Sequence, residues 1–198
     1  MKKNYLTEHE IKSLLLMDFH AEILNTVRDF FIFCCFTPLS LADLKRLQKK
    51  NVENGMWINM TLAKSDVESR IPLLQIPQLI YHKYVWETRY LCIFPIASIH
   101  TINHYMRQIG ESYNFGKDIT FRTAMNTFVY LASLYGVSSE TINRLIRNAD
   151  TNVIKSLLPM SDEKLLDEFA IFDEQSKEWG DLWAKRFNPN YYKLNFKI

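Results

Sequence analysis

The longest apolar stretch of the chain covers residues 27–36, and its only charges, Arg28 and Asp29, stand at its leading end. A Thr-Pro pair breaks the stretch directly afterwards, because proline disfavours helical backbone in the residue before it. Ser40 then offers an N-cap side chain, and Asp43 falls at the third helical position, as in a capping box. The pattern predicts a buried helix, a sharp corner and a short amphipathic helix.

A second capping signature lies closer to the N-terminus. Thr7 can cap a helix, Glu10 stands three residues later, and Leu6 can form an apolar staple with Ile11. The apolar face of this segment is supplied by Ile11, Leu14, Leu15 and, further on, Ile23 and Leu24. The signature predicts a helix that begins after Thr7.

Residues 57–62 alternate large apolar with polar side chains, which is the period of a half-buried strand. Residues 64–66 are polar and turn-like, and residues 69–74 can return as a second strand. Pro72 must then lie on an edge strand or at a strand end, because proline cannot donate to the ladder. We expect an antiparallel hairpin with Lys64 near its tip.

The rest of the chain carries helical signals. Pro77 suits the first position of a helix that runs to about Tyr84, Ser98 can cap the next, and Thr120 begins a long one that Gly136 closes. A short helix then starts at residue 138 or 139 and ends near residue 146, and Asp150 can cap one more over residues 151–158.

A final helix is predicted after Pro159, since Asp162 and Glu163 place acids in its first turn. Its apolar stripe is wide and consists of Leu165, Leu166, Phe169, Phe172, Trp179, Leu182 and Trp183. The fold class is therefore mainly α with a small antiparallel hairpin or sheet. We divide the chain into a core over residues 1–158 and a C-terminal helix and aromatic tail over residues 159–198.

Composition adds modest constraints. No apolar run approaches the ~20 residues of a membrane span, and three cysteines, two of them adjacent in the buried run, suit a reducing cytoplasm. The net charge of +2 does not by itself indicate a nucleic-acid partner. Residues 1–157 carry 18 basic against 14 acidic side chains, whereas residues 158–198 carry 6 against 8, so the body is mildly basic and the tail acidic.

Three segments, in this order, resemble the catalytic domain of the tyrosine recombinases, the phage integrase family. TPLSLADL at residues 37–44 is similar to the family's TGLRxxDL corner. Residues 57–74 resemble its strand, lysine loop and IPL strand, and residues 121–158 resemble its HxxRHTF block, the following glycine and the tyrosine segment. In that family a tyrosine attacks a DNA phosphate, two arginines bind the phosphate oxygens, a lysine protonates the leaving oxygen, and histidine-type residues assist.

The resemblance implies that most of these catalytic roles are vacant here. Ser40 stands for the first arginine and Met125 for the second, while Asp43 and Lys64 keep the acid and the lysine and Arg122 replaces the first histidine. The remaining positions hold Asn126 after the second arginine, Arg147-Asn148 for the Gly-His pair, and Leu157 for the nucleophile. Losing one preorganised donor typically costs about 10²–10³ in rate. We therefore expect an integrase-like protein of a mobile element that is not an enzyme, and also lacks the family's N-terminal DNA-clamping domain.

A possible weak DNA contact rests on basic residues, although Asp43, Lys64 and these side chains also fit an ordinary helix acid and a solvated surface. The candidates are Lys45, Arg46, Lys49, Lys50, Lys64, Arg122, Arg144 and Arg147. We expect no cofactor and no metal, because the His100 and His104 pair has no acid or cysteine nearby in sequence. The protein would then be cytoplasmic, and nucleoid-associated if it binds DNA.

Two other functions stay open. The chain could be a protein–protein module that kept the scaffold and lost DNA, with residues 160–198 contacting a second copy or another recombinase, as C-terminal segments of this family commonly do. It could also be an active recombinase with a displaced nucleophile, for which the tyrosines outside the Leu157 segment include Tyr81, Tyr130 and Tyr135.

Overall fold

A computed structural model describes residues 4–63, 68–87, 91–96, 98–113, 115–146 and 161–187. Its helices are α1 Glu8–Leu16, α2 Glu22–Cys35, α3 Leu41–Arg46, the 3₁₀ turn η1 Lys49–Asn51, α4 Gln75–Glu87, α5 Ile99–Ser112, α6 Phe121–Leu134, α7 Ser139–Ile146 and α9 Asp162–Phe187. Its strands are β1 Val52–Glu53, β2 Trp57–Thr61 and β3 Glu68–Pro72. The expectation of a mainly α chain with a small antiparallel sheet is confirmed.

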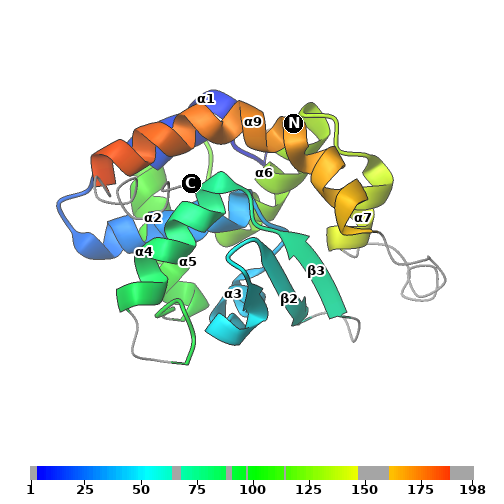
Figure 1. Cartoon of the computed structure of the whole chain (residues 1–198). Coiled ribbons are helices and arrows are strands. Elements are labelled where there is room, and N and C mark those ends of the chain that lie inside the picture. The colour runs from blue at the N-terminus through cyan, green and yellow to red at the C-terminus, as the bar shows by residue number, and fades with distance from the viewer. Residues whose placement is uncertain are drawn as a thin grey trace.

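Helix α2 passes through the centre of the body, with α9 across the top of the view beside α1 and with α3 and the hairpin below (Figure 1). Its side chains from Val27 to Cys35 are buried, including both charged ones. Aromatic rings pack against it, since Phe30 and Phe33 lie 5.2 and 5.0 Å from Phe94, and Phe31 lies 6.0 Å from Phe121 of α6, between ring centroids. The apolar stretch of the sequence is thus the core of the fold.

The local capping predictions are confirmed. Thr7 and Glu10 form a capping box at the start of α1, and Ser40 and Asp43 form another at the start of α3. Ser98 caps α5. Gly136 follows α6 with φ of 86°, the left-handed conformation that glycine adopts without strain after a helix.

The hairpin is also confirmed, and a short third strand extends it. The strand order is β1-β2-β3, all antiparallel, and Asn59 lies opposite Arg70 in the register. Pro72 ends β3, which is an edge strand, where the missing N–H costs no ladder bond. The predicted hairpin lysine, Lys64, lies outside the described residues.

Two sequence predictions about helices are wrong in detail. Pro77 is the third residue of α4, not the first, because the helix begins at Gln75, whose backbone N–H donates to Asp173 of α9 at 2.7 Å; it also ends at Glu87, beyond Tyr84. Ile23 does not continue the face of α1. The helical backbone is interrupted between α1 and α2. Ile23 lies in the first turn of α2, and this residue is 41% exposed.

Helix α9 packs its aromatic stripe on the body of its own chain. Phe172 lies 5.4 Å from Phe36, and Phe169 lies 6.4 Å from Phe128, between ring centroids. The stripe is narrower than predicted, because Leu166 is 52% exposed and Leu182 37% exposed. Ile99 at the start of α5 is likewise 52% exposed.

Acidic side chains of α9 form ion pairs or hydrogen bonds with several other elements. Asp162 pairs with Arg70 of β3, Glu168 accepts from Ser138 before α7, and Asp173 accepts from the first N–H of α4. These three acidic residues of the C-terminal part of the chain thus form contacts within the molecule. The short helix predicted over residues 151–158 falls outside the described residues.

Candidate nucleic-acid interface

The corner at residues 37–44, before and within α3, is held together by Asp43. Its carboxylate accepts hydrogen bonds from the Ser40 backbone N–H at 3.0 Å, from the Ser40 hydroxyl, and from the backbone N–H of Ala63 just after β2. Asp43 is only 4% exposed. The acid therefore fixes the start of α3 to the exit of β2, and the Ser40 hydroxyl is occupied by the cap.

The two adjacent cysteines behind this corner are core residues, as predicted. Burial raises the pKa of Cys34 well above its ordinary range, and the nearby Asp43 carboxylate adds to the effect. Burial also raises the pKa of the Cys35 thiol. Both side chains are buried and stay protonated as neutral thiols.

The candidate positions on α6 differ in environment. Arg122 is exposed in the first turn, whereas Met125 is half-buried and packs against the core. Asn126 donates from its amide to the backbone carbonyl of Asn4 at 2.8 Å. The position that corresponds to the family's second arginine thus holds Met125, a residue that packs against the core. Its neighbour Asn126 hydrogen-bonds to the N-terminal segment.

Four basic residues form what we call the basic ridge: Lys45, Arg46, Lys49 and Lys50. The three lysines are exposed. Arg46 donates from Nη2 to the carbonyl of Thr61 at 3.3 Å, and the amide of Asn51 donates to the carbonyl of Asn59 at 3.0 Å. These bonds attach the ridge to strand β2.

No contact among the described residues joins the other predicted DNA-contacting residues to the basic ridge. Arg144 of α7 is held near Glu140, with 3.7 Å between guanidinium nitrogen and carboxylate oxygen, and its side chain is 18% exposed. Lys64, Arg147, Asn148 and Leu157 lie outside the described residues. Among the described candidates, the four ridge residues are the ones that lie together in one short segment, residues 45–50.

Arg70, which no sequence pattern singles out as a candidate, is the sole basic residue of the three described strands. Its Nη1 donates to Glu53 at 2.6 Å and to Asn59 at 3.0 Å, and its Nε donates to Asp162 of α9 at 2.7 Å. Its guanidinium carbon lies 4.5 Å from the centre of the Trp57 ring. Period-2 alternation could have placed Arg70 on the face of Asn59, but not beside Asp162.

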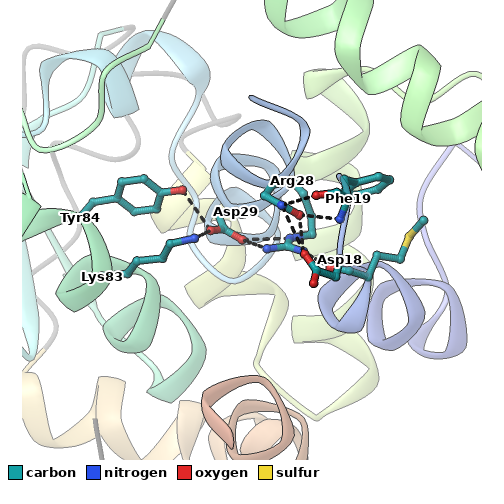
Figure 2. Close-up of polar contacts among 8 residues, drawn as sticks. Asp18, Phe19, Arg28, Asp29, Lys83 and Tyr84 are labelled. Carbon is teal, nitrogen blue, oxygen red and sulfur yellow. Dashed lines mark hydrogen bonds and ion pairs between the residues drawn. The ribbon is translucent and has the colours of Figure 1, made fainter. Parts of the chain in front are cut away.

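A second charged cluster was also missed, and it lies inside the body (Figure 2). Asp29 accepts from Arg28 Nε and Nη2 at 2.9 and 2.8 Å, and from Lys83 and Tyr84 of α4 at 2.8 and 3.0 Å. Arg28 also donates to the carbonyl of Met17, and its guanidinium lies 4.7 Å from the Phe187 ring centre.

This cluster is structural. The Asp29 carboxylate receives four donated hydrogen bonds, and the Arg28 and Asp29 side chains are at most 1% exposed. Burial, followed by the Asp29 charge, raises the pKa of Tyr84, so this phenol stays protonated. The cluster joins α2, α4 and the end of α9, and a saturated buried carboxylate has no lone pair to spare for a ligand.

The three tyrosines considered as displaced nucleophiles lie in different surroundings. Burial raises the pKa of Tyr81, and burial together with its hydrogen bond to Glu8 raises that of Tyr135. Tyr130 stacks on Tyr5 with ring centroids 4.2 Å apart. The raised pKa values keep the Tyr81 and Tyr135 phenols protonated at neutral pH.

Metal and membrane features can be assessed for the described part of the chain. His104 lies 3.3 Å from the Gln108 amide, and no group of three His, Cys, Asp or Glu side chains among the described residues is placed to hold a metal ion. None of the described helices combines the length and the apolar character that crossing a bilayer requires.

Comparison with known proteins gives a fold but no sequence relative. No protein-family model matches the chain, and neither does any curated protein. Among solved structures, the XerA recombinase matches with a TM-score of 0.61 and 17% identity. The XerH site-specific recombinase, bound to its difH substrate in a pre-cleavage complex, matches with a TM-score of 0.55 and 14% identity. The chain has a tyrosine-recombinase-like fold.

The match extends over most of this chain but not over the whole of either neighbour. It covers 84% and 86% of this chain, and 64% of XerA and 55% of XerH. The recombinase-like order of corner, hairpin and helices inferred from three short sequence segments is thus confirmed for the fold. What the neighbours bind and catalyse does not follow from identities this low.

Proposed function

We propose that the protein is a DNA-associated, integrase-like protein that takes part in recombination or its regulation without cleaving DNA. The observation that carries the proposal is the pairing of a tyrosine-recombinase-like fold with a corner whose hydroxyl and carboxylate serve as a helix cap. A mobile-element context, a cytoplasmic location and association with the nucleoid belong to the same proposal.

The proposed absence of DNA cleavage is supported by the residues that stand at the positions of the recombinase family's catalytic residues. Ser40 and Met125 replace the two arginines, and neither side chain can supply a guanidinium fork to a phosphate. The Ser40 hydroxyl is engaged in its helix cap, and the Met125 side chain packs against the core. Leu157, at the nucleophile position, has no hydroxyl.

The DNA contact is supported by the basic ridge. Lys45, Lys49 and Lys50 are exposed, and none of them forms an ion pair with another described residue. Lysines of this kind bind phosphates by releasing condensed counterions, which makes the affinity fall steeply with salt.

The competing function, a protein–protein module, receives less support. It drew on the aromatic stripe of α9, and Trp179 and Trp183 of that stripe are buried in the chain's own body. Self-association stays a prediction, and light scattering on the full chain over a concentration series tests it.

A charge-matched pair of variants tests the DNA contact. K45Q/K49Q/K50Q removes the three ridge lysines, and K164Q/K177Q/K185Q removes three exposed lysines of α9. Fluorescence anisotropy with a labelled duplex, from low to moderate salt, should show that the ridge variant binds DNA about tenfold or more weakly than wild type. The slope of its log affinity against log salt concentration should be smaller by about 2–3. Equal losses in both variants would leave only a nonspecific charge effect and would contradict a ridge interface.

A further inference from the structure

We propose that Arg70 can bind a DNA phosphate, and that Asp162 of α9 blocks this by occupying its guanidinium. Helix α9 would thereby limit the affinity of the β-hairpin for DNA. This inference rests on the proposed function, because it concerns the regulation of the same DNA-contacting surface. It assigns a role to a contact between residues 92 positions apart in the chain.

Arg70 has the surroundings of an anion-binding group. Its guanidinium carbon lies over the Trp57 ring, 4.5 Å from the ring centre, and Asn59 accepts from Nη1 at 3.0 Å, so the fork is oriented before any ligand arrives. Within the described residues Nη2 donates no hydrogen bond, and the side chain is 33% exposed. The Nε and Nη2 edge is the edge that binds a phosphate or carboxylate with two parallel hydrogen bonds.

Asp162 now occupies one half of that edge. Its carboxylate accepts from Nε at 2.7 Å, and Glu53 accepts from Nη1 at 2.6 Å. Two carboxylates on one guanidinium leave a net negative charge at the site, which repels a phosphodiester. The hydrogen bonds from Arg70 and then Asn59 lower the pKa of Glu53, so this acid is ionised at neutral pH.

Arg70 is also joined to the basic ridge. Asn59, which accepts from Arg70, receives at its backbone carbonyl the hydrogen bond from Asn51, the residue after Lys50. The Arg70 guanidinium is thus linked through β2 to the segment that carries Lys49 and Lys50. Freeing the arginine adds one phosphate contact to an existing surface instead of creating a separate site.

The test is a double-mutant cycle with a matched control. Asp162→Asn removes the carboxylate that blocks the fork, and Asp167→Asn makes the same charge change at an exposed residue of α9 that has no ion pair among the described residues. Arg70→Gln and the double variant R70Q/D162N complete the cycle. Thermal unfolding of each variant shows whether α9 stays docked.

We expect D162N to bind a duplex about threefold to fivefold more tightly than D167N, and its salt slope to steepen by about one. R70Q alone should bind no more tightly than wild type, because it leaves both carboxylates without their cation, while R70Q/D162N should lose the whole gain of D162N. A D162N affinity equal to that of D167N, or a gain that survives in R70Q/D162N, would overturn the inference while the proposed function stands. Absence of DNA binding by every variant at low salt would overturn the proposed function itself.

Discussion

The carboxylate of Asp43 accepts a hydrogen bond from the backbone N–H of Ala63, 20 residues away, and so connects the first turn of α3 to the end of β2. The same side chain closes the capping box with Ser40. One acidic residue thereby positions the helix corner and the hairpin relative to each other. This gives Asp43 a structural role that needs no catalysis.

Replacing Asp43 by alanine should lower the free energy of unfolding by about 2–3 kcal/mol, because it removes a helix cap and leaves the Ala63 N–H without its buried acceptor. Urea unfolding followed by circular dichroism measures the change. D167N, an exposed substitution, serves as the control and should stay within about 0.5 kcal/mol of wild type. A loss as small as this for D43A would mean that the corner does not depend on the bond.

The buried cluster of Figure 2 predicts an asymmetry between its members. Asp29→Ala leaves the fully buried Arg28 without its carboxylate and should cost about 3–5 kcal/mol in unfolding free energy. Lys83→Met should cost clearly less, since the Lys83 side chain is 19% exposed and water can replace part of its contact. Denaturant unfolding of the two variants decides, and a larger loss for K83M would contradict the assigned geometry.

Glu10 predicts a pH dependence of stability. Burial of its carboxyl opposes ionisation, but hydrogen bonds from Lys117 at 2.7 Å and from Thr7 outweigh it, so its pKa in the folded protein lies below the ordinary 4.5. A lowered pKa means that the stabilisation is complete above pH 4.5 and is lost as the pH falls through the folded-state value.

The corresponding measurement compares wild type with Glu10→Gln over a pH series. At pH 7 the variant should be less stable by about 1 kcal/mol, and the difference should shrink steadily below pH 4.5. A difference that stays constant down to pH 3 would show that the Lys117 contact does not stabilise the ionised carboxylate.

Local signals in the sequence were enough for much of the fold. The capping boxes at Thr7 and Ser40 involve residues three positions apart, and Gly136 acts on its own helix end, so each could be identified from a short segment. The alternation in residues 57–62 likewise depends on one strand and its neighbour. The residues that determine each of these features are close together in the sequence.

The remaining features depend on residues distant in the sequence. Helix α4 begins before Pro77 because Asp173, 98 residues away from Gln75, accepts its first N–H. The partners of Arg70 come from β1, β2 and α9, and no spacing rule links them. The burial of Arg28 and Asp29 could not be inferred either, since charged residues at the end of an apolar stretch ordinarily face water.

The central claim is that this recombinase-like fold binds DNA without forming a covalent link to it. Incubating the full chain with a nicked suicide duplex at low salt, then resolving the same sample under native and denaturing conditions, tests both parts together. We predict a native complex that dissociates as salt rises and no adduct after denaturation. A phosphotyrosyl protein–DNA adduct, or no native complex at low salt, would contradict the account.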